Sequence, residues 1–201
     1  MGNIDFRTGD LTGKLGGLVG ARWKQTPYAR RYVVPANPKT DDQMLVRNAF
    51  AFLIAIGRRI NSTILRLFTI PKPRDISAFN RFVQINKAMI NDGSLLYADV
   101  KVAAGSLYFE GGEMATKDLS LTVIAWNAGI QGEALASDLA ICLVYNETTD
   151  LWGFKTDDIR SAAISEVPMV ADPTDIVHAW IFFVQGTKIS SESVYMLAET
   201  S

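Results

Sequence analysis

Residues 9–31 restrict the possible folds of this chain more than any other stretch. They hold five of the fifteen glycines, followed by alternating aromatic and basic residues. A glycine-rich segment loses much conformational entropy on ordering, so it becomes ordered only where something packs over it. Pro27, Pro35 and Pro38 exclude a helix, although RRYVVP can form a short strand. We therefore predict an extended, Gly-rich basic arm over residues 1–39, held by a neighbouring molecule.

Residues 40–93 carry the pattern of a helical hairpin. Thr40 and Gln43 form a capping box, and two aspartates follow Thr40 at the positive end of the helix. Apolar residues then recur at helical spacing through residues 41–68. A proline-containing turn leads to a second amphipathic stretch over residues 75–91. Two helices joined in this way pack as an antiparallel pair.

The hydrophobic period changes to that of strands over residues 94–201. About seven short β-rich runs are separated by Gly, Asn, Asp and Pro, which predicts an antiparallel immunoglobulin-like β-sandwich. Residues 177–184, VHAWIFFV, are apolar on both faces, so this strand needs a second cover, either the helical pair or another subunit. The predicted fold class is therefore α+β, with an arm, a helical hairpin and a sandwich as three successive regions.

The charge of the chain is divided between its halves. Residues 1–90 contain fifteen Lys and Arg against five Asp, a net charge of +10, and residues 91–201 contain five against sixteen, a net charge of −11. Such asymmetry indicates a nucleic acid, a membrane or a complementary protein surface. Because the complementary charge lies in the same chain, copies can meet head to tail. The alternative is that the two halves neutralise each other within one monomer.

Export and membrane signals are missing from the sequence. The chain has no apolar run of eighteen residues, and its N-terminus lacks the apolar core of a secretory signal. We therefore expect no membrane partner, and a location in a virion or in the cytoplasm before assembly.

Few residues are suited to catalysis. His178 is the only histidine, which excludes a histidine metal pair, and we predict that it lies in a core or interface. Cys142 is the only cysteine, so no internal disulfide forms, and a buried structural thiol is expected. The acidic residues of the second half lie singly on turns, as expected of a solvated surface. The glycine segment contains neither G-x-G-x-x-G nor G-K-[ST], so we predict no catalytic, metal or cofactor site.

The best candidates for recognition follow the glycines, in the run ARWKQTPYARRY. Basic and aromatic side chains alternate there, so they can contact phosphates and stack on bases, as in single-strand binders. Trp, Tyr and Arg are also enriched at protein interface hot spots, and we favour a protein contact. The predicted partner-binding residues are Arg22, Trp23, Lys24, Tyr28, Arg30 and Arg31.

Nearly the whole chain resembles an uncharacterised family of Bacteroidota proteins that is also met in phages and prophages. The shared pattern is G-x-x-G-x-x-V-G, W-K, an Arg, and T-x-x-Q-x-x-x-R-x-x-F, at Gly13, Gly16, Val19, Gly20, Trp23, Lys24, Arg30 or Arg31, Thr40, Gln43, Arg47 and Phe50. Further matches are Asn80, Phe82 and Asn86, Gly105 and Leu107, Val144 to Asn146, and Ser191, Ser193 and Tyr195. The family usually has a glycine soon after W-K, where this chain has Gln25 and Thr26. The resemblance implies an arm, helices and an immunoglobulin-like sandwich, without catalytic residues.

These observations favour a non-enzymatic structural protein, and the first hypothesis is a phage virion component that binds neighbouring subunits, or copies of itself, through its basic arm. A nucleic-acid-binding accessory protein is the second hypothesis, because the first half is basic. An adhesive or carbohydrate-binding module at a cell surface is the third, and an enzyme is the last.

Overall fold

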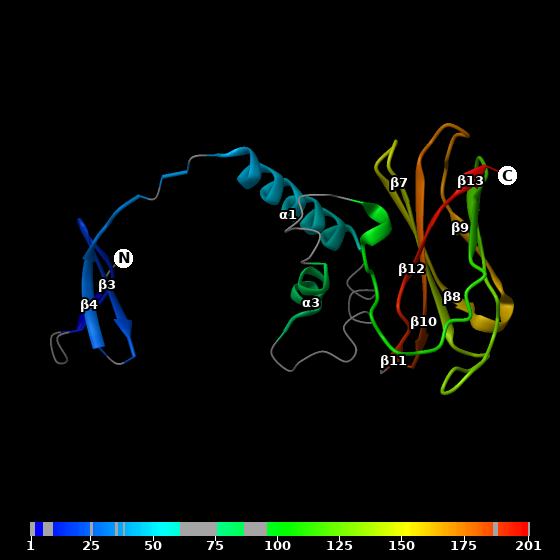
Figure 1. Ribbon diagram of the computed structural model, residues 1–201, viewed down its shortest axis with the longest axis horizontal. Coiled ribbons are helices and arrows are strands. Elements are labelled where there is room, and N and C mark those ends of the chain that lie inside the picture. Colours follow the sequence, from blue (N-terminus) through cyan, green and yellow to red (C-terminus); the bar gives the residue numbers. More distant parts are fainter. Residues whose placement is uncertain are drawn as a thin grey trace. The chain divides into compact units, whose positions relative to one another are not determined.

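A computed structural model describes residues 3–5, 10–24, 26–34, 36–37, 39–60, 76–86, 96–186 and 189–200. The chain divides into two compact units, Met1–Thr40 and Asp41–Ser201, which are described separately below (Figure 1). The fold class is α+β, with two helices and several antiparallel sheets over the described ranges.

The first unit is a four-stranded antiparallel sheet in the order β1-β2-β3-β4. Its strands are β1 (Asn3–Asp5), β2 (Asp10–Leu15), β3 (Leu18–Trp23) and β4 (Thr26–Arg31). The predicted extended arm is instead a sheet over most of its length, because the segment pairs with itself. Leu15 lies opposite Leu18, which leaves Gly16 and Gly17 as a two-residue turn with φ of +54° at Gly16. Two-residue hairpin turns require such positive φ, and glycine adopts it without strain.

The two helices of the second unit start near their predicted positions. α1 (Asp41–Arg59) begins with two aspartates in its first turn, which interact favourably with the helix dipole. α3 (Ala78–Ile85) is capped by Ser77, whose hydroxyl accepts a hydrogen bond from the Asn80 N–H at 3.2 Å. The remainder of both predicted helices and the proline turn between them, residues 61–75 and 87–95, lie outside the described residues.

The β-rich region contains two sheets. β11 (Ile189–Ser190) and β12 (Val194–Leu197) pair with one edge of β10 (Val177–Gln185), followed by β7 (Leu139–Asn146) and β8 (Leu151–Ile159). The second sheet has the order β13-β5-β6-β9, with β13 (Glu199–Thr200), β5 (Met114–Lys117), β6 (Leu121–Ala125) and β9 (Ile164–Pro168). The β13–β5 pair is parallel, and the other pairs are antiparallel. Short 3₁₀ turns span Tyr97–Asp99 and Arg160–Ala162.

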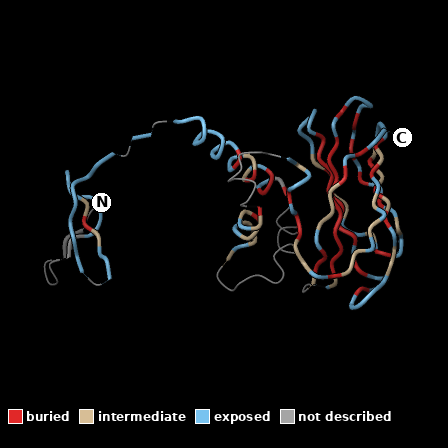
Figure 2. The backbone as a smooth tube through the Cα atoms, in the orientation of Figure 1, coloured by how far each residue is buried: buried red, intermediate tan, exposed pale blue. Residues whose placement is uncertain are grey.

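Strand β10 is buried on both faces, as its sequence predicts (Figure 2). Trp180 and Phe182 pack in one core with Leu53 of α1 and Phe82 of α3. The alternate residues Val177, Ala179, Ile181 and Phe183 pack in a second core with β5, β6 and β9. The expected second cover is therefore supplied by the helices, and the helical and β-rich regions form one unit that shares the first of these cores.

Asn86, at the C-terminal end of α3, joins this helix to the segment that leads into the sheets. Its side-chain amide donates to the carbonyls of Phe82 and Lys101 at 2.9 and 3.0 Å, and its Oδ1 accepts from the Lys101 N–H at 2.8 Å. Asn86 is itself buried, and buried polar groups are normally hydrogen-bonded in this way. Both polar backbone groups of Lys101 therefore depend on this one side chain.

We expect Asn86→Ala to lower the free energy of unfolding by about 2 kcal/mol, because it leaves backbone groups unpaired. Urea unfolding followed by tryptophan fluorescence measures this loss. Asn80→Ala is the matched control, since Asn80 lies exposed on the same helix. The stability of this variant should stay near that of the wild type. Equal midpoints for the two variants would contradict this role of Asn86.

Candidate interaction surfaces

The strand register places the six predicted partner-binding residues on two different faces of the N-terminal sheet and in a turn. Successive side chains of a strand point to opposite faces of its sheet. Tyr28 and Arg30 lie opposite Ala21 and Val19 of β3, so they share a face with Trp23. Arg22 and Arg31 lie on the other face, and Lys24 lies in the β3–β4 turn. The predicted residues therefore do not form a single patch.

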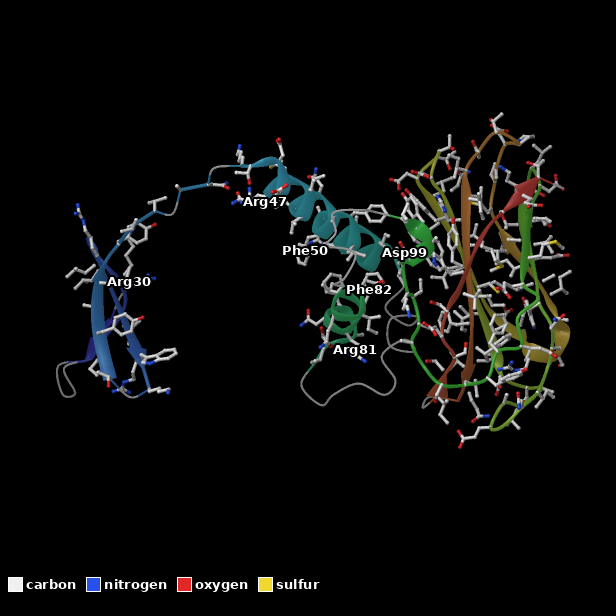
Figure 3. The ribbon with its side chains drawn as sticks, in the orientation of Figure 1. Arg30, Arg47, Phe50, Arg81, Phe82 and Asp99 are labelled. Carbon is white, nitrogen blue, oxygen red and sulfur yellow. The ribbon has the colours of Figure 1, made fainter. Side chains whose placement is uncertain are left out.

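The aromatic face of the N-terminal sheet consists of Lys14, Trp23, Tyr28, Arg30 and Tyr32. Trp23 is 70% exposed and Tyr28 is 46% exposed. Lys14 and Arg30 flank Val19 in one row across three strands, and the Lys14 ammonium lies 3.7 Å from the centre of the Tyr32 ring. Basic side chains and large aromatic rings therefore lie next to one another on this face, on which Arg30 is labelled in Figure 3. This composition is typical of interaction hot spots.

The leucine face on the other side consists of Leu15, Leu18, Arg22 and Arg31. Leu15, Leu18 and Arg31 form a row across three strands, and Leu18 is 47% exposed. Among the residues of this unit whose burial is described, only Gly20 is buried, and glycine has no side chain (Figure 2). A sheet normally needs a covered apolar face to be stable. Large apolar residues are therefore exposed on both faces of this sheet.

The β3–β4 turn departs from the usual turn chemistry. Lys24 has φ of +42°, a conformation that favours glycine. The resemblance leads one to expect a glycine close to this position. The ammonium of Lys24 lies 5.9 Å from the centre of the Trp23 ring, so the turn adds a third cation beside the aromatic face.

A second surface lies at one end of the two stacked sheets. Four segments meet there, and we call them the acidic loop end: residues 117–121, 146–151, 169–177 and 197–200. The Met169 N–H donates to the Ser120 carbonyl at 3.3 Å, and the Glu147 N–H donates to the Ile176 carbonyl at 2.8 Å. Its exposed acidic residues are Asp118, Glu147, Asp150, Asp172 and Glu199. Its exposed apolar residues are Leu119, Leu151, Val170, Ile176 and Leu197.

Buried polar groups fix the loops at this end. The Asn146 amide donates to the Asp175 carboxylate at 2.7 Å, and the Asp172 N–H donates to the same oxygen at 3.0 Å. The Asn146 bond lowers the pKa of Asp175. Lys117, also buried, donates to the Asp175 carbonyl. Asp175 and Asp138 are buried, so the expectation that the acidic residues of this half are all solvated is wrong for these two.

A third surface lies along α1, whose first two turns are exposed on all sides. A groove on this helix is lined by Val46, Arg47, Phe50, Ala51, Ile54 and Arg58. Arg47 and Phe50, two positions of the resemblance, lie in it (Figure 3). The groove is apolar between two arginines, and its chemistry suits a protein contact.

His178 is buried in a cluster of rings, as predicted for a core histidine. Its ring stacks on Tyr97 with centroids 4.0 Å apart, Nδ1 lies 2.9 Å from the Tyr195 hydroxyl and Nε2 lies 3.0 Å from the Glu147 carboxylate. Burial raises the pKa of Tyr195. All of the polar atoms of His178 are used within the fold.

Cys142 is buried within β7, and burial raises the pKa of its thiol to about 12, so a reactive thiolate does not form at neutral pH. The described part of the chain contains no cluster of three or more His, Cys, Asp or Glu that could hold a metal ion. In the same residues, no helix combines the length and apolar character needed to cross a membrane.

Comparison with known proteins gives one match. A family model described as a family of unknown function (DUF6266) matches residues 10–197. Neither the curated proteins nor the solved structures contain a match to the chain.

Proposed function

The chain belongs to this family of unknown function, and we propose that it is a non-enzymatic assembly protein that joins neighbouring subunits, including copies of itself, through its N-terminal sheet. The observation that supports this most directly is the exposure of large apolar residues on both faces of that sheet. A sheet of this kind gains stability when another protein surface covers it.

Charge favours a copy of the same chain as the neighbour. Residues 1–40 hold seven Lys and Arg against two Asp, a net charge of +5, and residues 41–201 hold thirteen basic against nineteen acidic residues, a net charge of −6. Oppositely charged surfaces accelerate association and fix its orientation. Assembly in a phage virion is the setting that we propose, and it rests on the resemblance to phage and prophage proteins.

We further propose an immunoglobulin-like arrangement for the two stacked sheets. The strand order supports it: β5, β6 and β9 correspond to strands A, B and E, and β8, β7, β10 and β12 correspond to C′, C, F and G. Sandwiches of this kind often serve as rigid bodies that present loops at their two ends. Such a body would hold the acidic loop end in a fixed geometry.

The assembly role predicts that Trp23→Ser/Tyr28→Ser weakens self-association of the full-length chain roughly a hundredfold. Light scattering should show oligomers that increase in size with protein concentration for the wild type and mainly monomers for the variant at the same concentrations, because two of the three exposed rings of the aromatic face are removed. Ile130→Ser, at an exposed apolar position in the second unit, is the control and should assemble like the wild type. A double variant that assembles normally would refute the proposal.

Nucleic-acid binding is the second candidate, favoured by the three rings and the cations of the aromatic face. Anisotropy of a labelled random single-stranded oligonucleotide distinguishes it. Tight binding that weakens steeply between 50 and 200 mM salt, and that Trp23→Ser/Tyr28→Ser removes, would support this candidate. Assembly predicts no such binding.

A further inference from the structure

We infer that the aromatic face of one copy docks on the acidic loop end of a second copy, so that copies join head to tail. This inference rests on the proposed function, and it adds the surface that receives the N-terminal sheet.

Charge is the first observation that pairs these surfaces. The aromatic face presents Lys14 and Arg30, with Lys24 beside it. The four segments of the acidic loop end contain six acidic residues and one Lys or Arg, Lys117. Lys117 is buried and bonded to the Asp175 carbonyl, so it does not neutralise the exposed carboxylates. The two surfaces therefore have opposite sign, which favours their encounter.

Apolar complementarity is the second observation. Leu119 is 63% exposed and Val170 is 67% exposed, and both lie among the carboxylates of the loop end. Trp23 and Tyr28 lie among the cations of the aromatic face in the same way. Contact between rings and aliphatic side chains removes apolar area from water and supplies affinity, while the charged pairs fix orientation.

The same charges argue against symmetric pairing. Two aromatic faces placed against each other would bring Lys14 and Arg30 of one copy towards the same residues of the other. Two loop ends would likewise oppose their carboxylates. Like charges placed opposite one another disfavour an interface, so a head-to-tail contact is preferred over a two-fold contact of either surface with itself. Such a contact continues into rings or open chains.

The acidic loop end is also preorganised for binding. Asn146 accepts hydrogen bonds from the N–H groups of Thr148 and Thr149 at 3.0 and 3.2 Å, and its amide holds Asp175 of the neighbouring loop. Little ordering is therefore needed when a partner arrives, which lowers the cost of association.

Complementation between two defective full-length chains tests this inference. Asp172→Lys/Glu199→Lys reverses two exposed charges of the loop end and leaves the sheet intact, and Trp23→Ser/Tyr28→Ser does the opposite. Each variant alone should self-associate roughly a hundredfold more weakly than the wild type. An equimolar mixture should form one-to-one complexes in sedimentation velocity, because one intact sheet meets one intact loop end and growth then stops.

Glu110→Lys/Glu133→Lys is the control, because it reverses two exposed charges away from the four loop-end segments and should assemble like the wild type. Normal assembly of the loop-end variant, together with failure of the sheet variant, would overturn the docking site and leave the proposed function standing. Normal assembly of the sheet variant would overturn both. If both variants are monomeric and their mixture forms no complex, the docking site is likewise refuted.

Discussion

Replacing Asp138 with Ala should lower the free energy of unfolding of the second unit by about 3–5 kcal/mol. Asp138 Oδ2 lies 3.2 Å from Arg160 Nε, and the two side chains are 1% and 0% exposed. The same carboxylate accepts hydrogen bonds from the Leu135 N–H and the Gln185 amide. Without it, the Arg160 guanidinium stays buried and loses its counter-charge. Urea unfolding followed by circular dichroism measures the loss.

The remaining contacts of Arg160 make this cost hard to avoid. Its guanidinium lies 3.8 Å from the centre of the Phe183 ring, and its carbonyl accepts a hydrogen bond from the Trp126 indole at 2.9 Å. Burial lowers the pKa of Arg160, and Asp138 acts in the opposite direction. The arginine is thus fixed by its surroundings and cannot easily turn towards solvent.

A double variant separates unpaired charge from lost packing. Asp138→Ala/Arg160→Met removes both charges, so it should cost less than Asp138→Ala alone. Asp157→Ala is the matched control, because it removes a carboxylate from an exposed pair with Lys155 and should leave the midpoint unchanged. A double variant less stable than Asp138→Ala would show that packing of Arg160, and not its charge, sets the cost.

Local signals in the sequence predicted the parts of the fold that depend on neighbouring residues. Thr40 and the two aspartates after it mark the start of α1, because caps and first-turn charges act within one helical turn. The unbroken apolar run of β10 indicated a strand covered on both sides, since burial on two faces removes the usual alternation. Both sequence signals can be recognised without knowing the tertiary structure.

The N-terminal segment resembles an extended arm because its five glycines make ordering costly in conformational entropy. Gly16 and Gly17 between two short alternating runs form a recognised hairpin signal. Pro27 is also compatible with a strand here, because β4 lies at the edge of its sheet. The N–H that proline lacks is therefore not needed for pairing with a further strand. The local sequence is therefore compatible with both an arm and a hairpin, and the pairing of β2, β3 and β4 distinguishes them.

The acidic loop end and the Asp138–Arg160 pair could not be derived from sequence. The carboxylates of the loop end come from four separated segments, which meet only once the strand order is set. Asp138 and Arg160 are similarly brought together by the antiparallel pairing of β7 with β8, in which Leu139 lies opposite Ile159. Nothing in the local pattern around either residue distinguishes it from a solvated charge.

Two further segments of the resemblance also meet only in the fold. The segment around Gly105 and Leu107 runs beside Ser191 and Ser193, with a parallel bridge between Leu107 and Ser191. The Leu107 N–H donates to the Ser190 carbonyl at 3.0 Å, and the Ser193 N–H donates to the Ala103 carbonyl at 3.0 Å. These bonds hold the segment against the edge of the sheet that carries β11 and β12.

Gly105→Ala should lower the free energy of unfolding by about 3 kcal/mol or more, because a methyl group at this position overlaps the facing backbone. A Cβ on Gly105 would lie 1.8 Å from the Ser190 carbonyl oxygen and 2.5 Å from its carbon. Relief requires the two backbones to separate, which breaks the bonds just described. Tryptophan fluorescence during urea unfolding measures the effect.

Gly132→Ala provides the comparison, since Gly132 has φ of +64° but open space around it, and its substitution should cost only about 1 kcal/mol. Ser190→Ala tests which atoms collide, because it removes the hydroxyl that would lie 2.6 Å from the new methyl group and keeps the carbonyl. It should not rescue Gly105→Ala, since the closest contact is with backbone. Full rescue by Ser190→Ala would mean that only a side chain stands in the way, and the close approach of the two chains would then not be what requires glycine at this position.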